Sequence, residues 1–155
     1  MINEKDMLIL AHLRRNSRLK LTDMSKKTGI PISTIYDRMS SLEPYFLRKH
    51  TAIINFEQLG FMTRVKIAMK INRDQRKALE IFLVKHENIN NVFKINNGYD
   101  YMIEAIFRNV RELDDFMDDI ETRFTFEIKT TYFVIEDVLR ESFLTDLRCL
   151  KVDEI

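Results

Sequence analysis

The stretch GIPISTIYDRMSSLE, residues Gly29–Glu43, decides how the first part of this chain folds. Gly29 tolerates a positive φ and allows a sharp turn, after which a short helix is predicted. The apolar residues of that helix recur at i, i+4 and i+7, so they share one face; they are Ile35, Met39 and Leu42. A second short helix is predicted upstream, over Thr22–Thr28. Two short helices joined by a glycine turn indicate a helix-turn-helix whose second helix reads DNA, although a helical hairpin in a core shows the same pattern.

The face opposite the apolar stripe is polar and suits a nucleic acid. Base contacts are expected from Ser33, Thr34, Tyr36 and Asp37. The hydroxyls of Ser33 and Thr34 are equally suited to capping the start of the helix. Arg38 lies only about 60° around the helix from the stripe, so it is expected to reach a phosphate rather than a base.

The flanking segments predict a winged helix-turn-helix. A helix N-capped by Asn3 comes first and ends in the basic pair Arg14–Arg15. Pro44 is expected to stop the reading helix, because its ring cannot continue it. A hairpin wing is then expected from two short strands, Phe46–His50 and Ala52–Phe56. In that wing, Arg48 and Lys49 would meet DNA phosphates.

The apolar period changes to two from Thr63, which is the period of a strand. Two capping boxes mark later helices: Asn72 with Gln75, and Asn109 with Glu112. The pair Asn97-Gly98 predicts a hairpin. The later strands are expected near Asn91–Asn96, Tyr99–Phe107 and Glu127–Ile135. The resulting order, β-α-β-β-α-β, is that of a ferredoxin-like α+β sandwich.

In that arrangement both helices cover one face of the sheet, and the other face is bare. The first helix is expected to bury Ala78, Ile81 and Phe82, together with the aliphatic stem of Lys85. The second is expected to bury Val110, Leu113, Phe116, Met117, Ile120 and Phe124. The bare face retains apolar side chains from the third and fourth strands, and exposed apolar sheet usually marks an interface. We therefore expect this domain to dimerise face to face.

Composition narrows the classes of function. Residues 1–60 hold ten Lys/Arg against six Asp/Glu, whereas residues 61–155 hold fifteen against eighteen, which fits a nucleic-acid module joined to another domain. Cys149 is the only cysteine, so an intrachain disulfide is excluded and a reducing cytoplasm is favoured. Neither a membrane span nor a signal peptide is predicted.

No catalytic, metal or cofactor site is predicted. The three histidines, His12, His50 and His86, show no metal-ligand spacing. The run Asp114-Asp115 with Asp118-Asp119 lies on the outer side of a helix whose other face is core. It is therefore interpreted as a solvated face.

The chain resembles the leucine-responsive regulatory protein/AsnC (feast/famine) family of transcription regulators over nearly its whole length. In the first domain the similar segments are DMLILAHL, NSRL, TGIPISTIYDRMSSLE and HTAIINFEQLG. In the second they are NGYDYMIEA at Asn97–Ala105 and KTTYFVI at Lys129–Ile135. The resemblance implies a DNA-binding homodimer, often assembled into tetramers or octamers and responsive to amino acids.

The resemblance also predicts an effector site near the Gly-x-Tyr-Asp-Tyr segment, at Asn97, Gly98, Tyr99, Asp100 and Tyr101; a hairpin start with buried aromatic rings explains these residues equally well. The chain departs from the family's pattern in two places, at Glu43-Pro44-Tyr45-Phe46 and at Phe124-Thr125-Phe126, where glycines are usual. At the second departure, Phe126 would fill space that a ligand uses.

The expected organisation is a DNA-binding domain over residues 1–56, a hinge over 57–62 and a ligand-response and oligomerisation domain over 63–137. A helix or tail is expected over 138–155. A tetrapyrrole (siroheme) decarboxylase on the same scaffold and an architectural DNA-compacting protein are the alternative functions.

Overall fold

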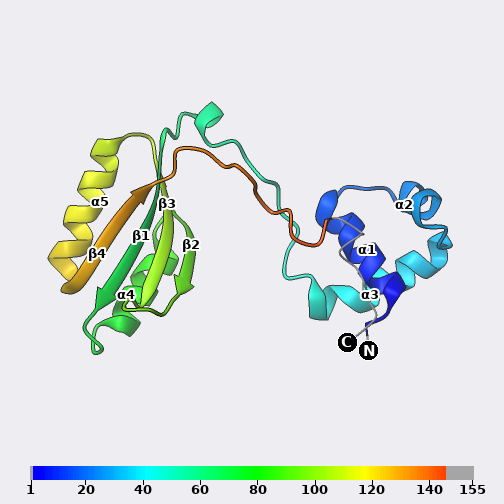
Figure 1. Ribbon diagram of the computed structural model, residues 1–155, viewed down its shortest axis with the longest axis horizontal. Coiled ribbons are helices and arrows are strands. Elements are labelled where there is room, and N and C mark those ends of the chain that lie inside the picture. Colours follow the sequence, from blue (N-terminus) through cyan, green and yellow to red (C-terminus); the bar gives the residue numbers. More distant parts are fainter. Residues whose placement is uncertain (1, 146–155) are drawn as a thin grey trace. The chain divides into compact units, whose positions relative to one another are not determined.

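The computed structural model describes residues 2–145, which divide into two compact units (Figure 1). The helical unit contains residues 2–53 together with 138–145. The sheet unit spans Ile54–Asp137. Residues 138–145, the described part of the expected C-terminal helix or tail, form no helix. Cys149 and the remainder of that segment, beyond residue 145, lie outside the described residues. Within the described range, no helix is long and apolar enough to cross a membrane.

Three helices form the helical unit: α1 (Glu4–Arg15), α2 (Leu21–Thr28) and α3 (Ile32–Phe46). Asn3 caps α1 as predicted: its Oδ1 accepts a hydrogen bond from the Asp6 backbone N–H at 3.0 Å. Gly29 ends α2 in the left-handed region, at φ 72°, which a glycine adopts at little cost. The three helices enclose a common core of Ile9, Leu10, Leu13, Met24, Ile30, Ile35 and Leu42.

Pro44 does not end α3, which corrects the sequence-based expectation. The helix continues through the proline to Phe46. Proline removes the backbone donor that would pair with the carbonyl of Ser40, but a helix tolerates that loss when the chain on both sides stays helical. Leu42, buried just before Pro44, and Leu47, packed against the core just after the helix, hold both sides.

The two strands predicted for the wing are not formed. Residues 47–55 contain neither helix nor strand. Because α3 runs on to Phe46, it takes the residue that was expected to open the first strand. Ile53 and Ile54 remain exposed, so this segment finds no apolar surface that would fix a hairpin against the helices.

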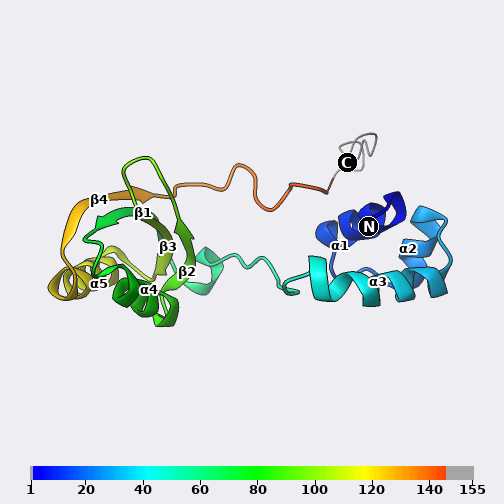
Figure 2. The same ribbon diagram turned by 90° about the horizontal axis from the view of Figure 1, so that it is seen from below.

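The sheet unit has the predicted β-α-β-β-α-β order, preceded by the short 3₁₀ helix η1 (Glu57–Leu59). Its elements are β1 (Thr63–Ile71), α4 (Arg76–Lys85), β2 (Ile89–Lys94), β3 (Tyr101–Phe107), α5 (Val110–Arg123) and β4 (Phe126–Phe133). The strands pair antiparallel in the order β2-β3-β1-β4. Both helices lie on the same side of the sheet (Figure 2).

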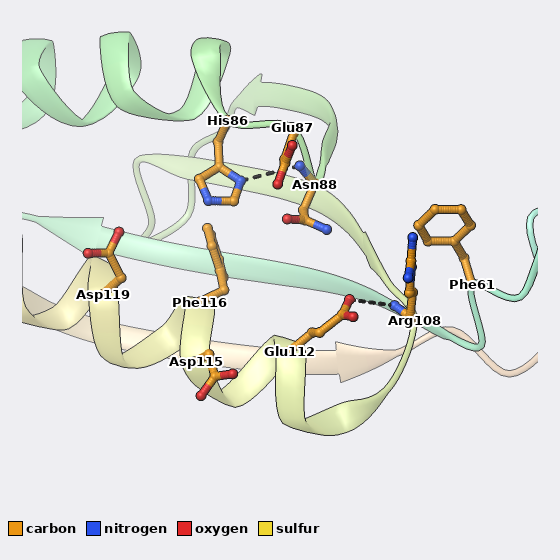
Figure 3. A pocket seen from close by; sticks show the side chains of 9 residues that line it. All are labelled: Phe61, His86, Glu87, Asn88, Arg108, Glu112, Asp115, Phe116 and Asp119. Atoms are coloured by element: carbon orange, nitrogen blue, oxygen red, sulfur yellow. Dashed lines mark hydrogen bonds between the residues drawn. The ribbon is translucent and has the colours of Figure 1, made fainter.

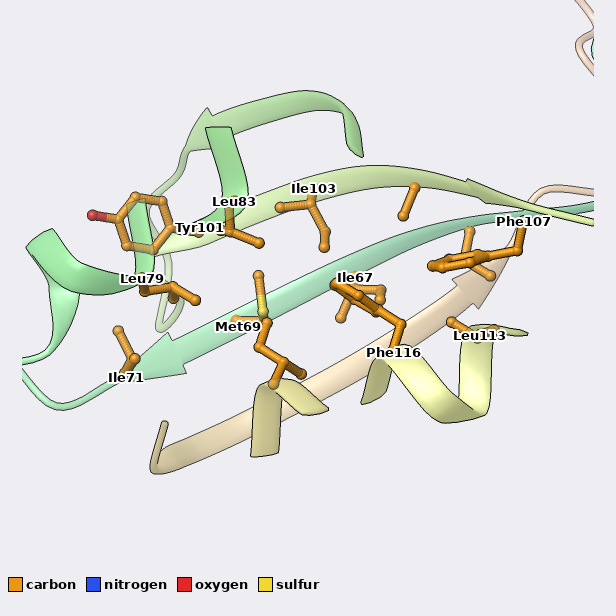
Figure 4. Close-up of a cluster of buried hydrophobic side chains, with 13 residues drawn as sticks. Ile67, Met69, Ile71, Leu79, Leu83, Tyr101, Ile103, Phe107, Leu113 and Phe116 are labelled. Carbon is orange, nitrogen blue, oxygen red and sulfur yellow. The ribbon is translucent and has the colours of Figure 1, made fainter. Parts of the chain in front are cut away.

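The core of the sheet unit lies between the sheet and its two helices (Figure 4). β1 contributes Val65, Ile67, Met69 and Ile71, as its alternating pattern predicted. From α5, Leu113, Phe116 and Ile120 are buried, and Met117 and Phe124 pack against them. Val110, which was also expected in this stripe, is exposed.

The first helix of the sheet unit, α4, differs from its predicted start and face. Gln75 is its N-cap without a side-chain hydrogen bond, because the Gln75 Oε1 instead accepts from the backbone N–H of Thr125 at 2.9 Å. The residues that face the sheet are Leu79 and Leu83, while Ala78, Ile81 and Lys85 are exposed and Phe82 is half-buried. The stripe that packs against the core therefore lies one residue further along the chain than predicted.

Candidate nucleic-acid interface and effector site

The outer surface of α3 carries the predicted base-contacting residues. Ser33, Tyr36 and Asp37 are exposed and Thr34 is half-buried, whereas Ile35 on the opposite side is completely buried. The N-cap of α3 is Pro31, and no side chain caps the start of this helix. The hydroxyls of Ser33 and Thr34 therefore have no capping role within the described residues, and they remain available to a partner.

Arg38 occupies a different environment from the one its position on the helix predicted. Its Nη1 donates to Oδ2 of Asp6 on α1 at 3.4 Å, forming an ion pair. The Asp6 side chain is 4% exposed and its other oxygen, Oδ1, has no hydrogen-bond partner, while the Arg38 side chain is 43% exposed. Arg38 thus joins α3 to α1 while part of its side chain remains exposed to solvent.

The two predicted wing cations lie on the irregular segment that follows α3. Arg48 and Lys49 are both exposed, and neither has an ion-pair partner within the described residues. Next to them, Nε2 of His50 lies 3.7 Å from a Glu43 carboxylate oxygen. The structure therefore leaves both cations free for an anion but fixes neither in a strand.

The predicted effector residues begin at the hairpin between β2 and β3. Asn97 and Gly98 have φ values of 61° and 89°, as the two-residue turn requires, and the Ile95 N–H donates to the Asp100 carbonyl at 3.1 Å. The hydroxyl groups of Tyr99 and Thr130 are 3.1 Å apart. The hairpin prediction is confirmed.

The side chains of Asp100 and Tyr101 are engaged inside the sheet unit. One Asp100 oxygen accepts from the Ile71 N–H at 3.0 Å, and the other pairs with Arg76 Nη2 at 2.6 Å. The Tyr101 hydroxyl donates to Glu80 at 3.3 Å; burial and this carboxylate raise the pKa of Tyr101. Only the fold brings Arg76 and Glu80 next to Asp100 and Tyr101. In the sequence they lie some twenty or more residues before that pair and share no motif with it.

Tyr99 and Tyr101 do not lie on the same side of the sheet, although alternation along a strand from Tyr99 predicted that they would. β3 begins only at Tyr101, and Tyr99 lies outside the strand, just after the turn at Asn97-Gly98. Tyr101 is buried in the core with the helices, whereas Tyr99 reaches Thr130, which pairs with Ala68 on the opposite face. The predicted effector residues are therefore neighbours along the chain that point into different surroundings.

A cavity of about 550 Å³ lies at one end of the helix-covered side, and none of the predicted effector residues lines it (Figure 3). Its lining comprises Phe61, His86, Glu87, Asn88, Arg108, Glu112, Asp115, Phe116 and Asp119. Glu112 is committed to the backbone N–H of Arg108, at 2.9 Å, and Asp119 to Arg123, at 2.8 Å. The described residues contain no group of three or more His, Cys, Asp or Glu that suits a metal ion.

The sheet face opposite the helices is partly apolar, as the sequence predicted. Phe93, Met102, Ala68 and Thr130 pair in one row across the four strands. Tyr132 and Phe93 on this face are 53% and 50% exposed. Beside them, Glu104 is buried and accepts hydrogen bonds from Arg64, Asn90 and Asn91 at 2.6–2.7 Å. A buried carboxylate on an uncovered sheet face was not expected from the sequence.

Comparison with known proteins assigns both units. Residues 2–43 match the family of winged helix-turn-helix DNA-binding domains, and residues 63–143 match the Lrp/AsnC ligand binding domain. The HTH-type transcriptional regulator FL11 of Pyrococcus abyssi is 33% identical over 120 residues, covering 77% of this chain and 80% of the relative. The regulator of the same name from Pyrococcus furiosus is 30% identical over 118 residues, covering 76% of this chain and 78% of the relative.

Solved structures confirm the fold. A transcriptional regulator from Neisseria meningitidis, determined in complex with L-Met, has a TM-score of 0.84 at 20% identity, covering 90% of this chain and 94% of that one. LrpC of B. subtilis has a TM-score of 0.80 at 15% identity, covering 89% of this chain and 97% of that one. These comparisons support neither the decarboxylase nor the DNA-compacting alternative. The chain belongs to the Lrp/AsnC family of DNA-binding transcription regulators.

Proposed function

We propose that α3 is the recognition helix and reads bases through Ser33, Thr34, Tyr36 and Asp37. The observation that carries this assignment is the side chain of Tyr36. It is 63% exposed and makes no hydrogen bond within the described residues, on a helix whose inner face is sealed by Ile35 and Leu42. Arg48, Lys49 and the solvent-facing side of Arg38 contact phosphates. Phosphate contacts position the helix, and base-edge contacts give sequence preference.

The test is a mobility-shift series with DNA from upstream of the chain's own gene, repeated over a range of salt concentrations. Tyr36→Ala is expected to change sequence preference, whereas Arg48→Ala is expected to weaken binding to all duplexes alike and to flatten the salt dependence. Tyr45→Ala is the matched control. Tyr45 is 84% exposed on the same helix but about 180° around it from Tyr36. If both tyrosine variants lost the same amount of DNA affinity and kept the wild-type sequence preference, the assignment would be refuted.

We propose further that the chain acts as a homodimer or larger assembly, joined through the sheet face that carries Phe93 and Tyr132. Supporting this, large apolar side chains lie exposed on that face, next to the row of Ala68, Met102 and Thr130. Tyr132→Asp is expected to shift the mass in solution to that of a monomer. Val84→Asp, an exposed apolar residue on α4, is the control and is expected to leave the mass unchanged.

The sheet unit is proposed to bind an amino acid or another small effector near Asn97–Tyr101. The complex of the Neisseria meningitidis regulator with L-Met supports this ligand class. Mass and melting temperature measured with a panel of amino acids, including L-Met, test the proposal. Asp100→Asn is expected to abolish any ligand-induced shift, and a shift that survives this substitution would place the effector elsewhere. Because the protein reads chromosomal DNA, we place it in the cytoplasm.

A further inference from the structure

A cluster of positive charge lies where α1 leads into α2. The segment RRNSRLK, residues 14–20, contains four cations and no acid. We call Arg14, Arg15, Arg18 and Lys20 the basic turn; all four are exposed. The backbone that carries them is ordered, because Asn16 Oδ1 accepts from the Arg18 N–H at 3.0 Å and the Leu19 N–H donates to the Asn16 carbonyl at 3.1 Å. The basic turn is therefore a preformed surface for an anion.

The chain's own C-terminal segment docks on one of these cations. Arg14 Nε donates to the Phe143 carbonyl at 3.2 Å, and Arg14 Nη2 forms an ion pair with the Glu141 carboxylate. Within the described residues, Arg15, Arg18 and Lys20 have no ion-pair partner. The docked segment closes with a turn in which the Thr145 hydroxyl donates to the Ser142 carbonyl at 2.7 Å. The Glu141 carboxylate thus pairs with one of the four cations of the basic turn, Arg14.

This docking is polar and loose. Val138 and Phe143 are 92% and 83% exposed, so the segment buries little apolar surface on the helical unit. Two of its non-glycine residues, Glu141 and Leu144, have φ values of 53° and 65°, which L-residues rarely adopt. An exposed ion pair of this kind contributes little to stability. The segment can therefore be displaced at low cost.

We propose that the basic turn binds backbone phosphates of DNA, and that Glu141 occupies Arg14 as an intramolecular competitor. An arginine guanidinium uses the same planar donor fork for a carboxylate and for a phosphate, so the two anions exclude each other at Arg14. Bound DNA displaces the segment, and the docked segment weakens DNA binding. The inference rests on the assigned DNA-binding function.

Glu141→Gln keeps the size of the side chain and removes its charge. Wild type and this variant are compared by mobility shift on one duplex over a range of salt concentrations. We expect Glu141→Gln to bind about two- to five-fold more tightly, because the exposed pair it breaks is weak. We also expect the plot of log affinity against log salt to steepen by about one unit per freed phosphate contact. Glu136→Gln is the matched control: it removes the same charge from an exposed residue that has no ion pair in the part of the chain that the structure describes.

The double variant Arg14→Gln/Glu141→Gln separates competition from net charge. If Glu141 acts through Arg14, the double variant binds as weakly as Arg14→Gln alone. The proposal is overturned if Glu136→Gln raises DNA affinity as much as Glu141→Gln does. It is likewise overturned if Glu141→Gln still raises DNA affinity in the Arg14→Gln background. It is also overturned if Arg15→Gln and Arg18→Gln leave the salt dependence of wild type unchanged. If the wild-type protein itself does not bind DNA, the result would instead contradict the DNA-binding function.

Discussion

Arg38 on the proposed recognition helix is paired with a buried carboxylate, that of Asp6 on α1, across 3.4 Å. Asp6 also caps its own helix, since its Oδ2 accepts from the Asn3 N–H at 3.0 Å. The one carboxylate therefore fixes the start of α1 and the position of α3. A residue that the sequence assigned to phosphate contact is thereby also part of the helical unit's internal structure.

Arg38→Ala is expected to destabilise the helical unit by about 1–2 kcal/mol, because it leaves a buried carboxylate with fewer partners. In an Asp6→Asn background, Arg38→Ala should cost less stability, because no buried carboxylate is then left without its cation. Urea unfolding of the two single variants and the double variant gives this coupling directly. Arg48→Ala, which removes an exposed cation that has no ion pair among residues 2–145, is expected to change stability by less than about 0.5 kcal/mol. Equal losses from Arg38→Ala in both backgrounds would show that the pair is not coupled.

His12 is expected to make the helical unit less stable in mild acid. Burial and the nearby positive charges of Lys27 and Arg15 lower the pKa of His12, and its Nε2 is buried without a hydrogen-bond partner. The unfolded chain therefore binds a proton more readily than the folded one, so stability falls as the pH drops through the ordinary histidine range near 6.5. Urea midpoints at pH 8 and pH 5 should differ less in His12→Leu than in wild type. An equal pH difference in His12→Leu and in wild type would contradict the prediction.

Pro44→Ala is expected to stabilise the end of α3 by about 1 kcal/mol. The alanine supplies the N–H that proline lacks and removes the ring from a helical turn. The amides of Tyr45 and Phe46 should exchange with solvent more slowly, as followed by hydrogen exchange. Pro31→Ala is the control: Pro31 is the N-cap of α3, where no helical N–H partner is required, and no gain is expected. Faster exchange in Pro44→Ala would mean that the proline rigidifies the junction.

Glu104→Gln is expected to cost the sheet unit about 1–3 kcal/mol at neutral pH, because it weakens three hydrogen bonds to a buried group. Burial alone would raise the pKa of Glu104, but the donors Asn90, Arg64 and Asn91 together lower it. The folded carboxylate therefore holds its charge below the usual glutamate range, and its contribution is lost as pH falls through that lowered pKa. Urea unfolding between pH 7 and pH 3 should show a smaller acid loss in the variant. Glu127→Gln, in an exposed pair with Lys70, is expected to cost less than about 1 kcal/mol.

Patterns confined to a few neighbouring residues predicted much of this structure. The Asn97-Gly98 turn, the Asn3 cap and the alternation of β1 all formed as expected, because each depends on the conformational preference of adjacent residues. The helix-turn-helix followed from Gly29 and the stripe of α3 for the same reason. The start of α4 was not predictable in this way, because Gln75 gives its side chain to Thr125, fifty residues further along the chain.

The sequence by itself determined the order of elements, the family and the polar face of the proposed recognition helix. Only the tertiary structure decided that Arg38 pairs with Asp6 and that Glu141 pairs with Arg14. It also decided that Glu104 accepts hydrogen bonds from Arg64, Asn90 and Asn91. Turns, caps and stripes are local, so a short window of sequence contains their cause. A pairing between charges dozens of residues apart depends on how whole helices and strands pack, and no short window of sequence contains that information.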